Sequence, residues 1–253
     1  MNTHNLPPTN PLTTWLIAGG LTLAVGCMAA AVFSGIGYRL GLWHFRTGFS
    51  IIRWAFFGGL GAVALLAAGL IIPPRPAGAQ IVMAVVGLIV AGATVYIPWS
   101  WKQTLDSLPY IHDITTDPDN PPAFVAIAGL REHGDHPVAY DGPEVAAQQR
   151  KAYPDLAPLT TSASPTKVFD AAESVISDMG LVLADTDRNE GRIEATQTSL
   201  LYGFKDDMVV RIAATANGAK VDVRSKSRVG RSDLGQNAKR IRTFLSKLQA
   251  ALS

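Results

Sequence analysis

Residues 15–33 read WLIAGGLTLAVGCMAAAVF, an apolar run without a charged side chain. Two runs of the same character follow at residues 54–72 (WAFFGGLGAVALLAAGLII) and 81–99 (IVMAVVGLIVAGATVYIPW). A helix needs roughly 20 such residues to cross a hydrocarbon core of about 30 Å, and inside a bilayer a helix satisfies its own backbone hydrogen bonds. The sequence therefore predicts a transmembrane region over residues 1–100, with three helices at about these positions.

The charged residues divide the chain into two halves. All 20 acidic residues come at or after Asp106, and up to residue 101 the only basic side chains are Arg39, Arg46, Arg53 and Arg75. All five tryptophans lie in the first half, most of them at the ends of the apolar runs, where an aromatic ring can sit among lipid headgroups. The first half is therefore predicted to be a membrane anchor, and the second half has the composition of a water-soluble domain.

The first apolar run has a rival interpretation as a cleaved signal peptide. A signal peptide carries a basic region before its apolar core, whereas residues 1–14 contain neither Lys nor Arg. Two further apolar runs also follow it. We therefore expect the first run to remain in the membrane as a helix.

Three arginines set the predicted orientation. Arg39, Arg46 and Arg53 lie between the first and second helices, whereas the second loop holds only Arg75. Basic residues near membrane spans favour the cytoplasmic side. We therefore expect a protein of the bacterial inner membrane with its soluble domain in the cytoplasm, and a periplasmic domain stays open as the alternative.

Small residues recur with helical spacing in the first two runs. They are Ala18, Thr22, Gly26 and Ala30, followed by Gly58 and Ala62. Such spacing lets helix backbones approach closely, which predicts a helix-packing face or the contact of a homo-oligomer. The alternative is that Gly and Ala are simply common in membrane helices.

The sequence predicts no metal site and no cofactor. The single cysteine, Cys27, excludes an intrachain disulfide and a thiolate cluster. His44 invites a haem or metal interpretation, but it stands beside Trp43 in a loop typical of the membrane interface. A second metal candidate, His112 with Asp113, Asp117 and Asp119, matches no established ligand spacing and is more typical of a loop with Asx turns. The net charge of +2 gives no argument for a nucleic-acid partner.

The soluble half begins with a linker, predicted over residues 101–122, that is rich in Pro, Asp, Asn and Thr. An irregular stretch with a short helix at 142–152 leads to a helix that Ser164 caps and Gly180 ends. Four strands are predicted next, at 181–185, 192–198, 208–214 and 220–228, before a final amphipathic helix that starts after Ser232. Residues 123–253 are thus predicted to form an α+β domain in the order α-β-β-β-β-α, an antiparallel sheet with both helices on one face.

The last predicted strand has one charged face, because Asp222, Arg224, Lys226 and Arg228 alternate with apolar or small residues. Such a face is exposed or binds something, and near an anionic leaflet each basic charge is worth about 1 kcal/mol. A structural alternative is that pairs of Asp and Arg lock the strands together. The candidate binding residues are Lys205, Asp206, Asp207, Arg211, Arg224, Lys226, Arg228, Arg231, Asp233 and Arg240.

Four motifs carry a resemblance to a known family. They are YPDL at 153–156, GRIEAT at 191–196, GFKDD at 203–207 and VDVRSKSRVGRSDLGQNAKRIR at 221–242. Together they resemble the uncharacterised, mostly bacterial family called domain of unknown function 1499, over about residues 122–253. The resemblance implies the domain and no activity. More loosely, the order of elements is similar to the helix-grip domains of the lipoprotein C subunit of the outer-membrane barrel assembly machine, which is an analogy of fold only.

Three functions stay open at this point. The first is a membrane-anchored binding or assembly module that docks a lipid surface, or another membrane or envelope protein, through the basic strand and the C-terminal helix. The second is a lipophilic-ligand or lipid-handling domain, since a helix-grip sheet can enclose a cavity under its long helix. The third, a hydrolase-type enzyme, is disfavoured because no histidine follows His136 to activate a nucleophile. No catalytic residue is predicted.

Overall fold

The computed structural model describes residues 11–253. The argument about the uncharged N-terminus therefore concerns a stretch whose first ten residues lie outside this range. The chain divides into two units, one ending at Gln103 and the other running from Thr104 to Ser253. Each unit is described by itself.

Three long helices make up the first unit: α1 (Pro11–Arg39), α2 (Phe45–Ile71) and α3 (Ala79–Ser107), the last of which continues into the second unit. Within the described residues, these three are long and apolar enough to cross a membrane, as predicted. Each helix extends beyond its apolar run. The short loop between α1 and α2 is closed by Trp43, whose indole Nε1 donates to the carbonyl of Ser34 at 3.0 Å.

The helices pack through small residues. Leu66 of α2 fits between two glycines, because a Cβ at Gly20 of α1 would lie 2.7 Å from Leu66 Cγ, and one at Gly87 of α3 would lie 2.8 Å from Leu66 Cδ1. The next layer consists of one alanine from each helix, all fully buried: Ala24, Ala62 and Ala91. Close backbone approach is the usual way for membrane helices to gain packing energy.

The predicted line of small residues is only partly the packing face. Ala62 is buried, and a Cβ at Gly58 would collide with Cys27 of α1. In α1, however, the inward positions of its first half are Thr13, Ile17, Gly20 and Ala24. A Cβ at Gly26 would meet no atom within 4 Å. Small residues occur on several sides of α1, so their spacing alone did not identify the inward face.

The domain is built on a six-stranded antiparallel sheet in the order β1-β6-β5-β4-β3, with β2 also paired to β6. The strands are β1 (Asp113–Thr115), β2 (Leu159–Thr161), β3 (Val182–Asp187), β4 (Arg192–Thr198), β5 (Lys205–Thr215) and β6 (Gly218–Ser227). The four longer strands confirm the predicted antiparallel sheet. Their boundaries differ from the predicted ones by up to a few residues.

The two short strands were not predicted. β1 lies inside the predicted linker and pairs Asp113 with Lys226, whereas β2 pairs Thr161 with Ala219. Both therefore lie along the same edge of β6. Three residues are too few to show the alternation by which a strand is recognised, and their partner strand lies far along the chain.

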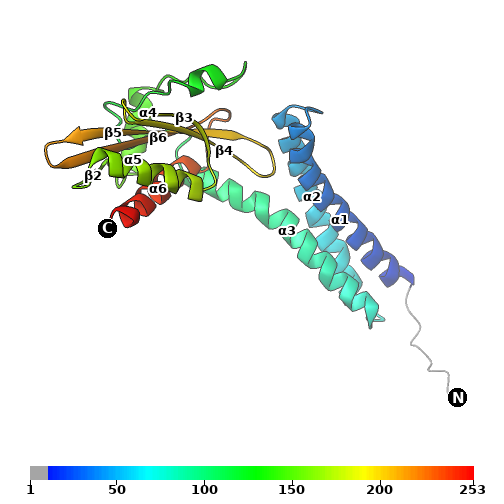
Figure 1. Ribbon diagram of the computed structural model, residues 1–253. Coiled ribbons are helices and arrows are strands. Elements are labelled where there is room, and N and C mark those ends of the chain that lie inside the picture. Colours follow the sequence, from blue (N-terminus) through cyan, green and yellow to red (C-terminus); the bar gives the residue numbers. More distant parts are fainter. Residues whose placement is uncertain (1–10) are drawn as a thin grey trace. The chain divides into compact units, whose positions relative to one another are not determined.

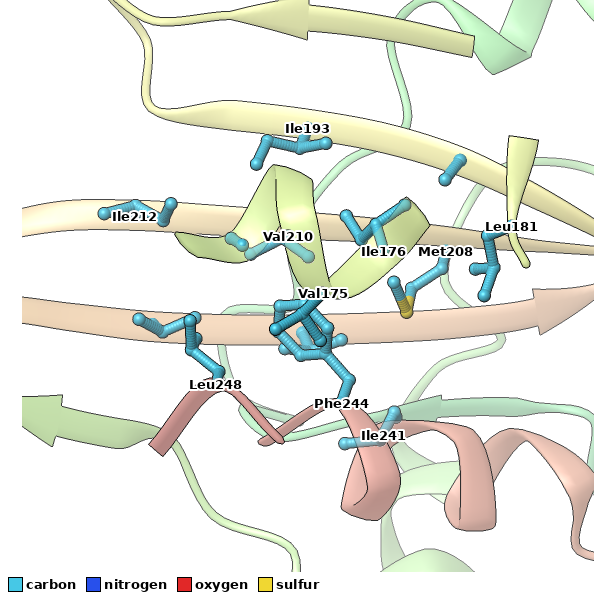
Figure 2. Close-up of a cluster of buried hydrophobic side chains, with 14 of the residues drawn as sticks. Val175, Ile176, Leu181, Ile193, Met208, Val210, Ile212, Ile241, Phe244 and Leu248 are labelled. Atoms are coloured by element: carbon cyan, nitrogen blue, oxygen red, sulfur yellow. The ribbon is translucent and has the colours of Figure 1, made fainter. Parts of the chain in front are cut away.

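Three α-helices complete the domain: α4 (Pro143–Ala152), α5 (Pro165–Asp178) and α6 (Gln236–Leu252). As predicted, α5 and α6 lie on one side of the sheet (Figure 1). Figure 2 shows Val175 and Ile176 of α5, Phe244 of α6 and Val210 of β5 in one cluster of buried side chains, which is the main hydrophobic core. Ser164 caps α5 by accepting from the Lys167 N–H at 3.3 Å, again as predicted.

The final helix begins later than the predicted start after Ser232. Leu234 has a positive φ of 55° and Gly235 one of 77°, so the chain is not helical there. The carboxylate of Asp233 accepts from the N–H groups of Gly235 and Asn237, at 2.8 and 2.7 Å. Asp233 is therefore the residue that satisfies the free N–H groups at the start of α6.

Candidate functional site

The charged face of β6 is covered by another part of the chain. Residues 116–141, called the cover segment below, include the 3-10 helix η1 (Ile127–Leu130) and lie on the side of the sheet away from α5 and α6 (Figure 1). Phe124 and Ile127 of this segment pack on Val209 of β5. The exposed fractions beneath it are 2% for Arg224, 0% for Lys226 and 5% for Arg228.

Arg224 is held from several directions. Its Nε and Nη2 donate to the two carboxylate oxygens of Asp113, both at 2.8 Å. Nη2 also donates to the carbonyl of Val138 at 2.9 Å. The guanidinium lies 5.0 Å from the ring centre of Phe124 and 5.4 Å from that of Tyr140. This side chain therefore ties β6 to β1 and to both ends of the cover segment.

Lys226 is fully buried beside the same carboxylate. Its Nζ lies 3.1 Å from Asp113 and donates to Asp141 at 2.6 Å and to the carbonyl of Ala139 at 2.7 Å. An ammonium group has three N–H donors. All three thus have acceptors within reach, so no N–H of the buried ammonium group lacks a hydrogen-bond partner.

Asp207 of β5 is the counterpart for two arginines. Arg228 contacts it through Nε and Nη2, both at 2.9 Å, and Arg131 of the cover segment through Nη2 at 3.0 Å. The hydroxyl of Thr196 adds a fourth donor at 2.8 Å. Burial lowers the pKa of Arg131, and the charge of Asp207 opposes that shift. One carboxylate is therefore shared by two guanidinium groups, and the carboxylate of Asp135 lies 3.8 Å from Arg228 as well.

Glu194 of β4 anchors the start of η1. Its carboxylate accepts the N–H groups of Val125, Ala126 and Ile127 at 2.8, 3.1 and 2.8 Å. The first N–H groups of a helix have no partner within it, so a carboxylate placed there is favourable. Arg192 also contacts Glu194. The cover segment is thus attached to the sheet at its middle as well as at its ends.

Two histidines stack at the edge of this region. The rings of His112 and His136 have centroids 4.0 Å apart, and Nε2 of His112 lies 3.3 Å from Asp141. Burial lowers the pKa of His112, and the neighbouring His136 lowers it further, while Asp141 acts in the opposite direction. His136 contacts the carbonyl of Gly230 through Nε2 at 2.8 Å.

The metal candidates of the linker do not form a cluster. Within residues 11–253, no group of three or more His, Cys, Asp or Glu side chains is arranged to hold a metal ion. Asp113 is taken up by Arg224 and Lys226, as described above. Asp117 lies 3.2 Å from Lys220, and Asp119 lies 2.6 Å from Arg150.

A second polar cluster lies on the helix side of the sheet. Arg240 of α6 donates to Asp206 at 2.7 Å, to Gln197 at 2.8 Å and to the hydroxyl of Ser225 at 2.9 Å. Asn237 accepts from that hydroxyl at 2.7 Å. Burial raises the pKa of nearby Asp233, although the backbone N–H groups that it accepts favour its charged form. These residues fasten α6 to the sheet.

The remaining candidates lie at or near the surface. Arg211 contacts Asp222 at 2.9 Å and keeps 28% of its side chain exposed, whereas Lys205 lies 4.0 Å from Glu132 and is 45% exposed. Arg231 is exposed in the loop before α6. The structure therefore brings together Arg224, Lys226, Arg228 and Asp207 under the cover segment and does not bring the ten candidates into one site.

The charged residues of this region hold the cover segment on the sheet. Below, the polar layer denotes Asp113, Arg131, Asp141, Glu194, Asp207, Arg224, Lys226 and Arg228. Within it each basic group faces a carboxylate. A buried ion pair adds little net stability compared with apolar side chains, but a single uncompensated charge left behind is very unfavourable. The polar layer therefore specifies one arrangement of sheet and cover segment, which matches the structural alternative left open by the sequence.

Sequence reasoning missed the partners that the cover segment supplies. Asp141 and Arg131 lie in a stretch without periodicity, so nothing indicated that it would cover the sheet. One signal was present, however. Glu194, Asp207 and Asp222 lie on the same side of their strands as Arg224, according to the pairing of Glu194 with Val209 and of Val209 with Arg224. A face with charges of both signs on three adjacent strands indicates that these charges pair with one another inside the domain.

A shallow pocket of about 230 Å³ lies beside α4, lined by Pro118, Gln149, Arg150, Tyr153, Pro154 and Leu156. Its buried polar side chain, Gln149, exchanges two hydrogen bonds with the backbone of Thr115, at 2.6 and 3.0 Å. The YPDL motif thus borders this pocket, and Gln149 helps to hold β1 in place.

The exposed basic side chains near the C-terminus lie on α6. Lys239, Arg242 and Lys247 point away from the core, and Arg242 pairs with Asp155 at 2.6 Å. The helix contains no acidic residue. Its outer face is therefore basic, whereas its inner face carries Ala238, Ile241, Phe244 and Leu248.

Comparison with known proteins identifies the family of the domain but gives no function. A family model described as "Protein of unknown function (DUF1499)" matches residues 113–248, more than half of the chain. No curated protein matches the sequence.

Proposed function

Because the chain belongs to the DUF1499 family, whose members share a domain and no assigned activity, we propose a function from geometry: a membrane-anchored binding or assembly module that docks a protein partner through the outer face of α6. The observation that carries this proposal is the position of the basic side chains. The basic residues of β6 are engaged inside the fold, whereas Lys239 and Lys247 of α6 are exposed.

The basic residues of β6 and its end therefore have another role in docking than the predicted one. Arg224, Lys226 and Arg228 are buried, so they hold the domain together and do not themselves contact a partner. A rigid domain loses little conformational entropy when it binds, which favours affinity. The outer face of α6, with no acid of its own, is complementary to an acidic patch on another membrane or envelope protein, or on a second copy of the chain.

The proposed location is the bacterial inner membrane, with the domain on the cytoplasmic side. Arg39, Arg46 and Arg53 support it, because they lie in the α1–α2 loop and the adjacent helix turns, and Lys102 follows the third apolar run on the same side. After the first loop the chain would cross the membrane twice, through α2 and then α3. Two crossings return it to the side of that loop, so the loop and the domain share one side.

Photocrosslinking in intact cells tests the docking face. A photoreactive amino acid at Ser246, on the exposed side of α6, is expected to give a discrete crosslinked protein product with the full-length chain. Reversing the charges with Lys239→Glu and Lys247→Glu is expected to remove that product. The measurement is the yield of the product relative to the amount of chain in the membrane fraction.

Lys151→Glu on α4 is the matched control, because this lysine is also exposed but lies on another helix. It should leave the yield unchanged. A product that survives the double charge reversal would rule out electrostatic docking through α6. Crosslinks to lipid alone would favour a lipid surface as the occupant of this face.

The lipid-handling alternative receives less support from the geometry. The space between the sheet and the pair α5 and α6 is filled by a continuous cluster of the domain's own buried side chains, from Val168 and Phe169 to Phe244 and Leu248. A ligand cavity there would require the helices to move away from the sheet. Copurified lipid from the full-length protein would revive this alternative.

A further inference from the structure

The loop between β4 and β5 is an apolar projection from the surface of the domain, and it carries the most exposed large hydrophobic side chain among the described residues. Residues 199–204 read SLLYGF, and Leu200 is 92% exposed. Tyr202 and Phe204 stack, with ring centroids 5.0 Å apart. Contiguous exposed apolar surface, rather than one exposed side chain, marks a contact with a partner or a membrane, and here the half-buried Leu201 adjoins Leu200.

The loop has a defined shape. The Ser199 N–H donates to the carbonyl of Phe204 at 2.8 Å, and the Gly203 N–H donates to the carbonyl of Ser199 at 3.0 Å. The Phe204 N–H donates to the hydroxyl of Ser199 at 2.9 Å. Gly203 has a φ of 71°, which a glycine adopts without strain. Leu200 is therefore held outward by a closed turn.

This loop lies at the end of the domain where the chain arrives from α3. Leu108, the first residue after α3, lies against the start of α6, since a Cβ at Gly235 would be 3.0 Å from its Cδ1. The carbonyl of His112 accepts from the Ser227 N–H at 3.0 Å, at the end of β6. The next residue, Arg228, donates to the carbonyl of Lys205, the first residue of β5, at 2.9 Å. Hydrogen bonds thus connect the incoming chain to the base of the loop.

The connection between the third apolar run and the domain is short. α3 is continuous from its apolar run to Ser107. A helix rises about 1.5 Å per residue, so the stretch from Trp101, just after the apolar run, to Leu108 covers only about 10 Å. A connection of this length allows the end of the domain that carries the loop to reach the headgroups.

Charge around the loop fits an anionic surface. Lys205 at its base is 45% exposed, and Arg231 is exposed in the loop that follows β6. Asp206 is neutralised by Arg240 at 2.7 Å. Basic side chains beside an exposed leucine are the usual composition of a segment that enters the interface of an anionic bilayer.

We propose that the β4–β5 loop inserts Leu200, with Leu201 beside it, into the interface of the bilayer that holds the chain's own helices. The loop is then a second membrane contact besides α3, and two contacts fix the orientation of the domain. The occupant is a lipid surface. A protein partner on the same loop is the competing outcome of the test.

The test uses the full-length chain in nanodiscs of phosphatidylethanolamine and phosphatidylglycerol. Cys27 is the only cysteine, so Cys27→Ser gives a background in which Thr198→Cys, exposed at the end of β4 beside the loop, carries an environment-sensitive fluorophore. A nitroxide attached near the top of the lipid acyl chains is expected to quench most of this fluorescence. Asn217→Cys, exposed in the β5–β6 turn at the opposite end of the sheet, is the matched control and should keep its fluorescence.

Adding Leu200→Asp to the Thr198→Cys chain is expected to abolish the quenching, because a carboxylate does not enter the interface. This variant changes a side chain that is almost entirely exposed, so the fold is retained. Quenching at residue 198 that is no stronger than at residue 217 overturns the proposal. So does quenching that Leu200→Asp leaves unchanged, or a loop that crosslinks to a protein in cells while it stays unquenched in nanodiscs.

Discussion

Asp207 faces two of the four basic groups in the polar layer. It faces Arg228 and Arg131 at once and accepts from Thr196 as well. Arg224 has more partners, but they include carbonyls and two aromatic rings in addition to Asp113. A single substitution at Asp207 therefore has the clearest expected result.

Asp207→Asn removes the carboxylate that faces two buried guanidinium groups, after which Arg228 keeps a longer contact with the carboxylate of Asp135, at 3.8 Å. Breaking a buried ion pair by removing one partner costs about 3–5 kcal/mol, and we expect a loss of this size in the free energy of unfolding of the domain. Hydrogen exchange of the β5 and β6 amides in the full-length protein measures it. Asp119→Asn serves as the control, since this side chain is 85% exposed beside Arg150, and it should change exchange little. Similar exchange in the two variants would contradict the conclusion that the polar layer holds the cover segment on the sheet.

His112 gives the domain a pH dependence of known sign. The pKa of His112 in the folded state lies below its usual 6.5, because of burial first and then His136, with Lys226 acting in the same direction and Asp141 and Asp113 opposing. Below about pH 6.5 the unfolded chain therefore binds a proton that the folded chain does not. Stability should fall as the pH drops through this value and level off below the folded-state pKa.

The measurement is thermal unfolding of the full-length protein across the range from neutral pH to about pH 5, where carboxylates with ordinary pKa values near 4 stay ionised. His112→Gln should flatten the dependence. His133→Gln, an exposed histidine in the cover segment, should retain it. A dependence that survives in His112→Gln would assign the effect to another group.

At the scale of elements, the cover segment is held on the sheet by a separate set of hydrogen bonds. Glu194 supplies three of its hydrogen bonds to the sheet. A hydrogen bond to a charged group contributes about 1.5–3 kcal/mol. Glu194→Gln, which keeps the shape and removes the charge, should raise amide exchange at residues 125–127 by about ten- to a hundredfold, since 1.4 kcal/mol corresponds to a factor of ten.

The amides of β5 should change far less than those of η1, because the strand keeps both of its neighbours. Glu190→Gln is the control, since this carboxylate is 63% exposed beside Arg192. Equal acceleration across the whole domain would mean that the cover segment and the sheet open as one unit.

Elements with their own periodicity could be predicted from the sequence, and elements defined by distant partners could not. α5 has a capping serine and an apolar stripe, and β5 and β6 alternate along their length, so all three were predicted. β1 has three residues and pairs with a strand more than a hundred positions later. The same reason explains the site: the charges of β6 were visible, but the cover segment that buries them carries no pattern.

At the scale of the whole molecule, orientation in the membrane is the property that decides which partners are within reach. Alkaline phosphatase and, separately, a fluorescent protein fused after Ser253 report it. The arginines of the first loop lead us to expect fluorescence without phosphatase activity, which corresponds to a cytoplasmic domain. Phosphatase activity would contradict the charge rule for this chain and move the proposed partner of α6 to the envelope side.

The order of synthesis determines when the ion pairs of the polar layer can form. Arg224 lies 111 positions after Asp113, and Lys226 lies 85 positions after Asp141. A ribosome releases the acidic residues long before the basic ones exist, and contacts between such distant positions form slowly. α3 precedes all of them in the chain, so it can enter the bilayer while the domain is still incomplete. The domain can therefore complete its polar layer only after β6 has been translated, by which time α3 has had the opportunity to enter the bilayer.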